Sequence, residues 1–163
     1  MHCMNRRQWI VAAIASVCAA SSAVAAGAPP PADFVRKVYE RDIERHNTRL
    51  PPDNSAFYAL FARPLRALIN APPSPNPNVP LGRIVHALFG HGALPGREVT
   101  LRDVKTIREH GISATVNVAL SVFDNPRDVV VTLHRDGNGW LISEIEYAPG
   151  DTLSAHHRRR IGQ

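Results

Sequence analysis

A strict alternation of apolar with small or polar side chains over residues 112–122 constrains this chain more than any other feature. Successive side chains of a strand point to opposite faces of a sheet, so this period of two predicts a strand with one buried face. The apolar set is Ile112, Ala114, Val116, Val118, Leu120 and Val122. Before Gly96 the apolar residues recur at helical spacing instead. We therefore expect helices first and strands afterwards.

The expected helices each have a local signal for where they begin or end. Asp33 stands where an N-cap is expected for the first helix. Pro64 divides the second apolar run into two helical pieces, because proline is favoured in a first turn and breaks a helix interior. Gly90 is expected to close the last helix, which follows a loop over residues 71–80. The expected helices cover residues 33–46, 55–62, 64–70 and 81–89.

Three further strands are expected around the alternating one. Their apolar markers are Val99, Leu101 and Ile107 before it, Val129, Val131 and Leu133 after it, and Trp140–Tyr147 at the end. The last strand changes parity between Ile142 and Ile145, which predicts a β-bulge near Ser143–Glu144. The predicted fold class is α+β, with N-terminal helices packed on the Val116 and Val118 face of a curved four-stranded antiparallel meander.

The N-terminus has the organisation of an export signal. Arg6 and Arg7 precede an apolar stretch, and Ala23-Val24-Ala25 offers a small-residue cleavage pattern. The paired arginines also fit a twin-arginine signal, while general secretion and an uncleaved anchor are the alternatives. We expect a cleaved signal peptide at 1–25, a periplasmic location, a Pro-rich spacer at 26–32, one domain at 33–154 and a basic tail at 155–163.

Charge and cysteine content exclude several function classes. The formal charge is +5, but the leader carries two of the arginines and the tail three, and the residues between them hold 14 basic and 14 acidic side chains. This balance gives no basic face for nucleic acid. Both cysteines, Cys3 and Cys18, lie in the leader, so no disulfide and no thiol chemistry is expected after cleavage. No cofactor motif is present.

Three segments resemble the bacterial domain of unknown function 3828 family: DFVRKVYERDI, LFARPLRALI and VTLHRDGNGWLISEIEYAPGDTL. The resemblance covers about Ala32 to Leu153. It implies a cone similar to nuclear transport factor 2, in which a curved antiparallel sheet wraps around helices, and an exported location. Members of this family often carry an Asp- and Gln-containing segment where this chain has LGRIVHALFGH over residues 81–91, so no role of that segment carries over. The family implies no settled activity.

One candidate acid–base group follows from strand parity. Asp103 shares the parity of Val99 and Leu101, so a regular strand turns its carboxylate inward, where it can act as a general base with Tyr39 or Tyr58 as hydroxyl donor. The favoured alternative is a bulge that turns Val104 inward and both Asp103 and Lys105 outward, because two charges do not share a dry face.

The remaining candidate residues are interpreted as structural. His86, His91 and His110 do not have the spacing of a metal site, and one helix-face histidine and two turn histidines is the favoured interpretation, so no metal is expected. Phe61, Trp140 and Tyr147 are expected as pocket or core anchors.

We therefore expect an exported, non-catalytic module that binds a small apolar ligand or a protein partner. The small polar face of the long strand can pair with a second copy, which would give a homodimer. A small lyase or isomerase that uses Asp103 and a tyrosine is one alternative. An immunity or inhibitor protein is the other.

Overall fold

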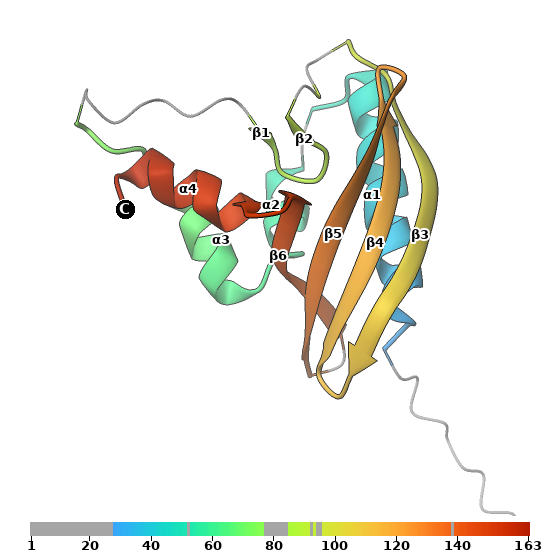
Figure 1. The fold of residues 1–163 in the computed structure, drawn as a ribbon. Helices are drawn as coiled ribbons and strands as arrows, with labels where there is room; N and C mark the ends of the chain where they lie inside the picture. The colour runs from blue at the N-terminus through green and yellow to red at the C-terminus, as the bar shows by residue number, and fades with distance from the viewer. Residues whose placement is uncertain (1–27, 52, 77–84, 92, 94–95, 138) are drawn as a thin grey trace, which may run out of the picture.

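The computed structural model describes residues 28–51, 53–76, 85–91, 93, 96–137 and 139–163, in an α+β arrangement (Figure 1). The signal peptide expected at 1–25 lies outside the described residues. The described strands form a five-stranded antiparallel sheet in the order β3-β4-β5-β6-β7 and a two-stranded sheet of β1 and β2. The strands are β1 (Val85–His86), β2 (Gly90–His91), β3 (Val99–His110), β4 (Ser113–Val122), β5 (Asn125–Asp136), β6 (Gly139–Ala148) and β7 (Asp151–Thr152).

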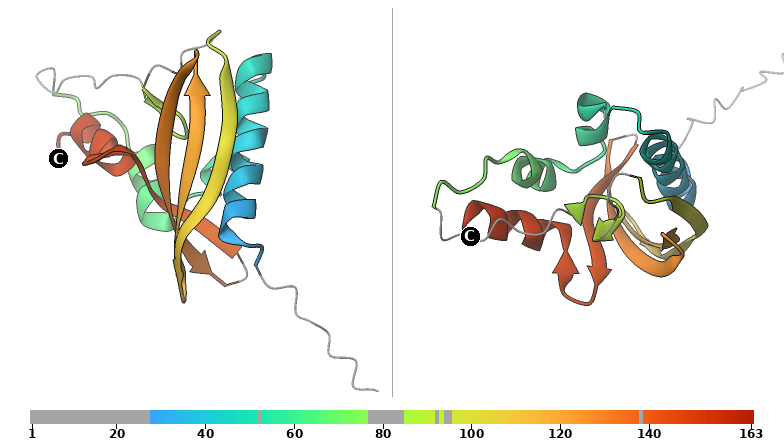
Figure 2. Two further views of the ribbon diagram at one scale, coloured as in Figure 1. Left: turned by 45° about the vertical axis from the view of Figure 1, so that its right-hand side comes forward. Right: turned by 90° about the horizontal axis from the view of Figure 1, so that it is seen from above.

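From Ser113 to Val122 the alternating segment is a strand with one buried face, as predicted. Its residues Val116, Val118 and Leu120 are 0% exposed. Helix α1 (Pro31–Thr48) packs against this strand and its neighbour β3, and Figure 2 shows it lying along the sheet. The expectation of four strands was wrong, because the chain turns back after β6 and adds the short strand β7 to the sheet edge.

Two predicted bulges are confirmed by the strand registers. The ladder between β3 and β4 shifts between Leu101 and Asp103, which leaves Val104 buried. The ladder between β5 and β6 skips Ser143, which explains the parity change in the last strand. Ile107 and Ile112 were expected inside but are about 60% exposed. Ile107 falls in a second bulge of β3, and Ile112 lies in the turn between β3 and β4.

The N-terminal helices follow the apolar pattern with shifted ends. They are α1 (Pro31–Thr48), α2 (Asn54–Tyr58) and α3 (Arg63–Asn70). Pro30, not Asp33, is the N-cap of α1, so the expected spacer contributes the first two helical residues. Pro64 stands in the first turn of α3, as predicted. The chain between α2 and α3 lies beside β6, where Ile142 exchanges backbone hydrogen bonds of 2.8 Å with Leu60 and Ala62.

The helix expected at 81–89 was wrong. Residues 81–84 lie outside the described residues, and the rest form β1, a turn and β2. Leu88 and Phe89 in that turn are 0% exposed. These two residues therefore belong to a turn that packs into the core. A turn does not require apolar residues at helical spacing.

The expected basic tail is a helix, α4 (Leu153–Ile161). Thr152 caps its first turn by accepting a hydrogen bond from the Ala155 backbone N–H at 3.2 Å. Leu153 is fully buried, and α4 packs against α3 and β6. Among the described helices, none is long and apolar enough to cross a membrane.

Arg160 ties α4 to the end of α3, so we expect the Arg160→Gln variant to be less stable. Its guanidinium donates to the backbone oxygens of Ile69 at 3.1 Å and Ala71 at 2.6 Å. Charged donors of this kind contribute about 1.5–3 kcal/mol. Urea unfolding followed by circular dichroism measures the loss, with Arg158→Gln on the exposed side of the helix as the matched control. Equal stability of the two variants would contradict the docking of α4.

Candidate functional site

The hairpin of β1 and β2 is held in place by two tyrosines. Tyr39 of α1 donates a buried hydrogen bond to the Leu88 oxygen at 2.9 Å, and Tyr147 of β6 donates to the Ala87 oxygen at 2.5 Å. Gly90 has a φ of +74°, and a side-chain carbon there would stand 2.8 Å from Cδ1 of Tyr147. Only glycine fits this position, so the sequence fixes where the hairpin turns against the sheet.

A hollow of about 390 Å³ lies between the C-terminal end of α1 and this hairpin. We call it the α1-end hollow. Asp42, Arg45 and His46 line it from α1, and His86 lines it from β1. The remaining lining residues are Arg49, Leu50 and Pro51, which come directly after the last residue of α1. The helix ends before Pro51 because the residue that precedes a proline disfavours helical geometry.

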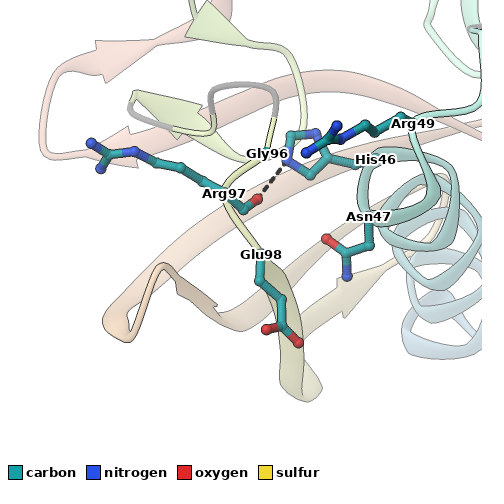
Figure 3. Close-up of a pocket in the computed structure, with 6 residues that line it drawn as sticks. All are labelled: His46, Asn47, Arg49, Gly96, Arg97 and Glu98. Atoms are coloured by element: carbon teal, nitrogen blue, oxygen red, sulfur yellow. Dashed lines mark hydrogen bonds between the residues drawn. The ribbon is translucent and has the colours of Figure 1, made fainter.

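A second hollow of about 340 Å³ adjoins the first, since His46 and Arg49 line both (Figure 3). The His46 Nε2 atom lies 2.8 Å from the backbone oxygen of Arg97, which is the dashed line in Figure 3. Asn47 fixes the other wall by pairing with both the N–H and the oxygen of Val99, at 3.0 and 2.8 Å. The end of α1 is thereby fastened to the start of β3.

The α1-end hollow contains two enclosed polar groups with unusual electrostatics. Burial raises the pKa of the Asp42 carboxyl, and Arg41 and Arg45 offset only part of the effect. Burial lowers the pKa of His86 to about 4, so its ring is neutral at pH 7. That ring stacks on Phe89, with centroids 4.2 Å apart and planes 5° from parallel. A carboxylate thus lies beside a neutral imidazole.

These two groups do not satisfy each other. Asp42 Oδ2 and His86 Nε2 are 3.6 Å apart, which is too far for a hydrogen bond. Within the described part of the chain, neither Asp42 Oδ2 nor His86 Nδ1 has a hydrogen-bond partner. Buried polar atoms are normally paired, so each calls for a ligand or an ordered water. The arrangement can accept a hydrogen bond from a bound molecule or exchange a proton with it.

The structure places Asp103 at the surface, where its side chain is 44% exposed. Its Oδ2 atom lies 2.7 Å from Nζ of Lys105. The hydrogen bond from Lys105 lowers the pKa of this carboxyl. Asp103 and Lys105 both point outward around the buried Val104, which is the arrangement favoured by the charge argument.

The predicted aromatic residues are largely structural. Phe61 and Trp140 are in the core, at 0% and 2% exposure, and Tyr147 packs against the core with partial exposure. Tyr39 is fully buried, and burial raises its pKa far above the ordinary value. Tyr58 is half-buried beside Phe57 at the surface helix α2.

The histidines differ from expectation. His86 is in strand β1 rather than on a helix face, and His110 ends strand β3. His91, in β2, lies within 3.3 Å of Asp151. Asp42 and His46 were not predicted as site residues. They follow Val38 at intervals of four and so lie on the buried stripe of α1. Two polar residues on an otherwise apolar stripe are a signal that the sequence does contain.

Comparisons with protein-family models, with curated proteins and with solved structures give no match for this chain. What the α1-end hollow does must therefore follow from its own residues.

Proposed function

We propose that this protein is an exported, non-catalytic module that binds a small ligand in the α1-end hollow. The observation that carries the proposal is the pair of enclosed polar atoms, Asp42 Oδ2 and His86 Nδ1, without partners among the described residues. Both residues line the hollow, so a small turn of either side chain lets a bound ligand reach the polar atom and supply its partner.

The lining of the hollow favours a polar ligand over the apolar one expected from the sequence. Asp42 accepts a hydrogen bond from a hydroxyl or ammonium group at the inner end. Arg45 already donates to the backbone oxygen of Pro51, whereas the exposed Arg49 makes no ion pair within the described residues. The Arg49 guanidinium suits a carboxylate or phosphate. A small molecule with a donor at one end and an anionic group at the other fits this arrangement.

The proposal extends to fold family and location. A curved antiparallel sheet with α1 on its buried face supports a nuclear transport factor 2-like cone, and the quoted segments support membership of the domain of unknown function 3828 family. The leader pattern supports export to the periplasm. Cell fractionation with N-terminal sequencing tests both cleavage after Ala25 and the compartment.

We expect the Asp42→Asn variant to lose the ligand. Native mass spectrometry of the tag-free protein, purified from the periplasm, should show an added mass on the wild-type protein that is absent from the variant. The amide keeps the shape of the carboxylate and removes its charge and one acceptor. Asp33→Asn, at the exposed other end of the same helix, is the matched control and should retain the ligand. An added mass that survives Asp42→Asn would contradict the site.

A second candidate function is a lyase or isomerase that uses Asp42 as its base. The largely buried carboxylate favours it, because burial raises the pKa of Asp42 and makes it a stronger base than a solvated aspartate. The exposed, ion-paired Asp103 does not support the same chemistry. The two functions are distinguished by the fate of the bound molecule, since a binding module releases it unchanged and an enzyme converts it into a product.

A further inference from the structure

A second cluster of chemically active side chains lies on the other side of the β1–β2 hairpin. His91 of β2, Asp151 of β7 and His156 of α4 bring one donor atom each to within 4.8 Å of one another. The His91 Nε2 atom lies 3.3 Å from Asp151 Oδ2, and His156 Nε2 lies 2.7 Å from Asp151 Oδ1. In Figure 1, the hairpin lies between α4 and the main sheet.

From this juxtaposition we propose that His91, Asp151 and His156 bind a divalent transition-metal ion, with Zn²⁺ as the best fit. Two imidazoles and one carboxylate are a common ligand set for Zn²⁺. Tetrahedral ligands at the usual 2.0–2.1 Å from zinc are about 3.4 Å apart, so the observed separations need only small side-chain movements. With three protein ligands, a fourth position remains for water or a ligand.

The backbone around each residue is fixed independently of any ion. The His91 backbone oxygen accepts a hydrogen bond from Arg127 of β5. Asp151 pairs with Ala148 across the β6–β7 turn, and the Gly150 N–H of that turn donates to Glu146 at 3.0 Å. His156 lies in the first turn of α4, whose start is anchored by the buried Leu153. A site organised in this way loses little conformational entropy on binding an ion.

Arg159 is the competitor of a metal ion at this site. Its Nη2 atom lies 2.9 Å from His156 Nδ1 and 3.9 Å from Asp151 Oδ1. A metal on Nε2 requires the proton on Nδ1, so Arg159 must turn away when the ion binds. Its side chain is 55% exposed and therefore has room to move.

The test is zinc titration by calorimetry of the tag-free protein after chelator treatment, together with thermal melting. We expect one Zn²⁺ per chain, a rise in melting temperature with zinc, and no binding of Mg²⁺, which prefers oxygen ligands. The variants Asp151→Asn, His91→Ala and His156→Gln should each weaken zinc binding at least about tenfold. Asp151→Asn is nearly isosteric, so it stays informative if a histidine variant fails to fold.

Two matched controls sharpen the outcome. His157→Ala removes the neighbouring histidine of α4 and should leave affinity unchanged, and Arg159→Gln should leave it unchanged or raise it. If Asp151→Asn and His156→Gln bind zinc as the wild-type protein does, or if the wild-type protein binds none, the proposal is overturned. The test involves no residue that lines the α1-end hollow, so its result is independent of the proposed function.

Discussion

The Trp140→Ala variant is expected to lose about 3–5 kcal/mol of its free energy of unfolding. Trp140 is 2% exposed, and its indole N–H donates to the Pro29 oxygen at 2.8 Å. The Cζ atom of Arg135 lies 4.4 Å from the centroid of the ring. Removing the ring therefore leaves a cavity under β6 and releases the chain that leads into α1. The free energy of unfolding of a natural domain is about 5–15 kcal/mol in total, so this loss brings the variant close to being unfolded.

Urea unfolding followed by far-ultraviolet circular dichroism measures this loss. The matched variant Trp140→Phe keeps most of the buried ring and loses the hydrogen bond to Pro29, so its loss should be about 1–2 kcal/mol. A loss below about 1 kcal/mol for Trp140→Ala would mean that the last strand is not seated as described.

Acidification is expected to cost this protein stability through His86, by about 2–3 kcal/mol between pH 7 and pH 4. Folding lowers the pKa of this ring from 6.5 to about 4, so below pH 6.5 the unfolded chain binds the proton that the folded chain excludes. The stability contributed by the neutral ring is complete above pH 6.5 and is lost as the pH falls toward 4. The side chain is 29% exposed, and solvent reduces the effect accordingly.

The difference between the wild-type protein and a His86→Gln variant isolates this effect. Other titrating groups act in both proteins, including Asp42, whose raised pKa has the opposite sign and favours the folded state at low pH. Urea unfolding at pH 7, 5.5 and 4 should show a steeper decline for the wild-type protein. Parallel declines would show that His86 is already solvated.

The sheet could be predicted because its signals are local. The alternation over residues 112–122 predicts the long strand, because every second side chain of a strand faces the core. The parity change after Ile142 predicts the bulge in the last strand. Residues 85–91 could not be predicted in this way. Their apolar run has helical spacing, but Leu88 and Phe89 are a buried turn held by Tyr39 and Tyr147 from distant elements.

The residues of the candidate sites also differ in whether a local sequence signal predicts their position. Asp42 and His46 lie on the apolar stripe of α1, so their position in a hollow follows from helix geometry. His86 required knowledge of where the hairpin docks. The partnership of His91, Asp151 and His156 has no sequence signal at all, because it depends on α4 folding where a solvated basic tail was expected.

The position of His86 beside Asp42 and against Phe89 is the central claim, since the α1-end hollow depends on it. An NMR titration of the histidine ring protons tests it directly, with the His86→Gln variant identifying the resonance. We expect the His86 midpoint at about pH 4. A midpoint near 6.5, the value of a solvated imidazole, would contradict both the enclosed pair and the binding site built on it.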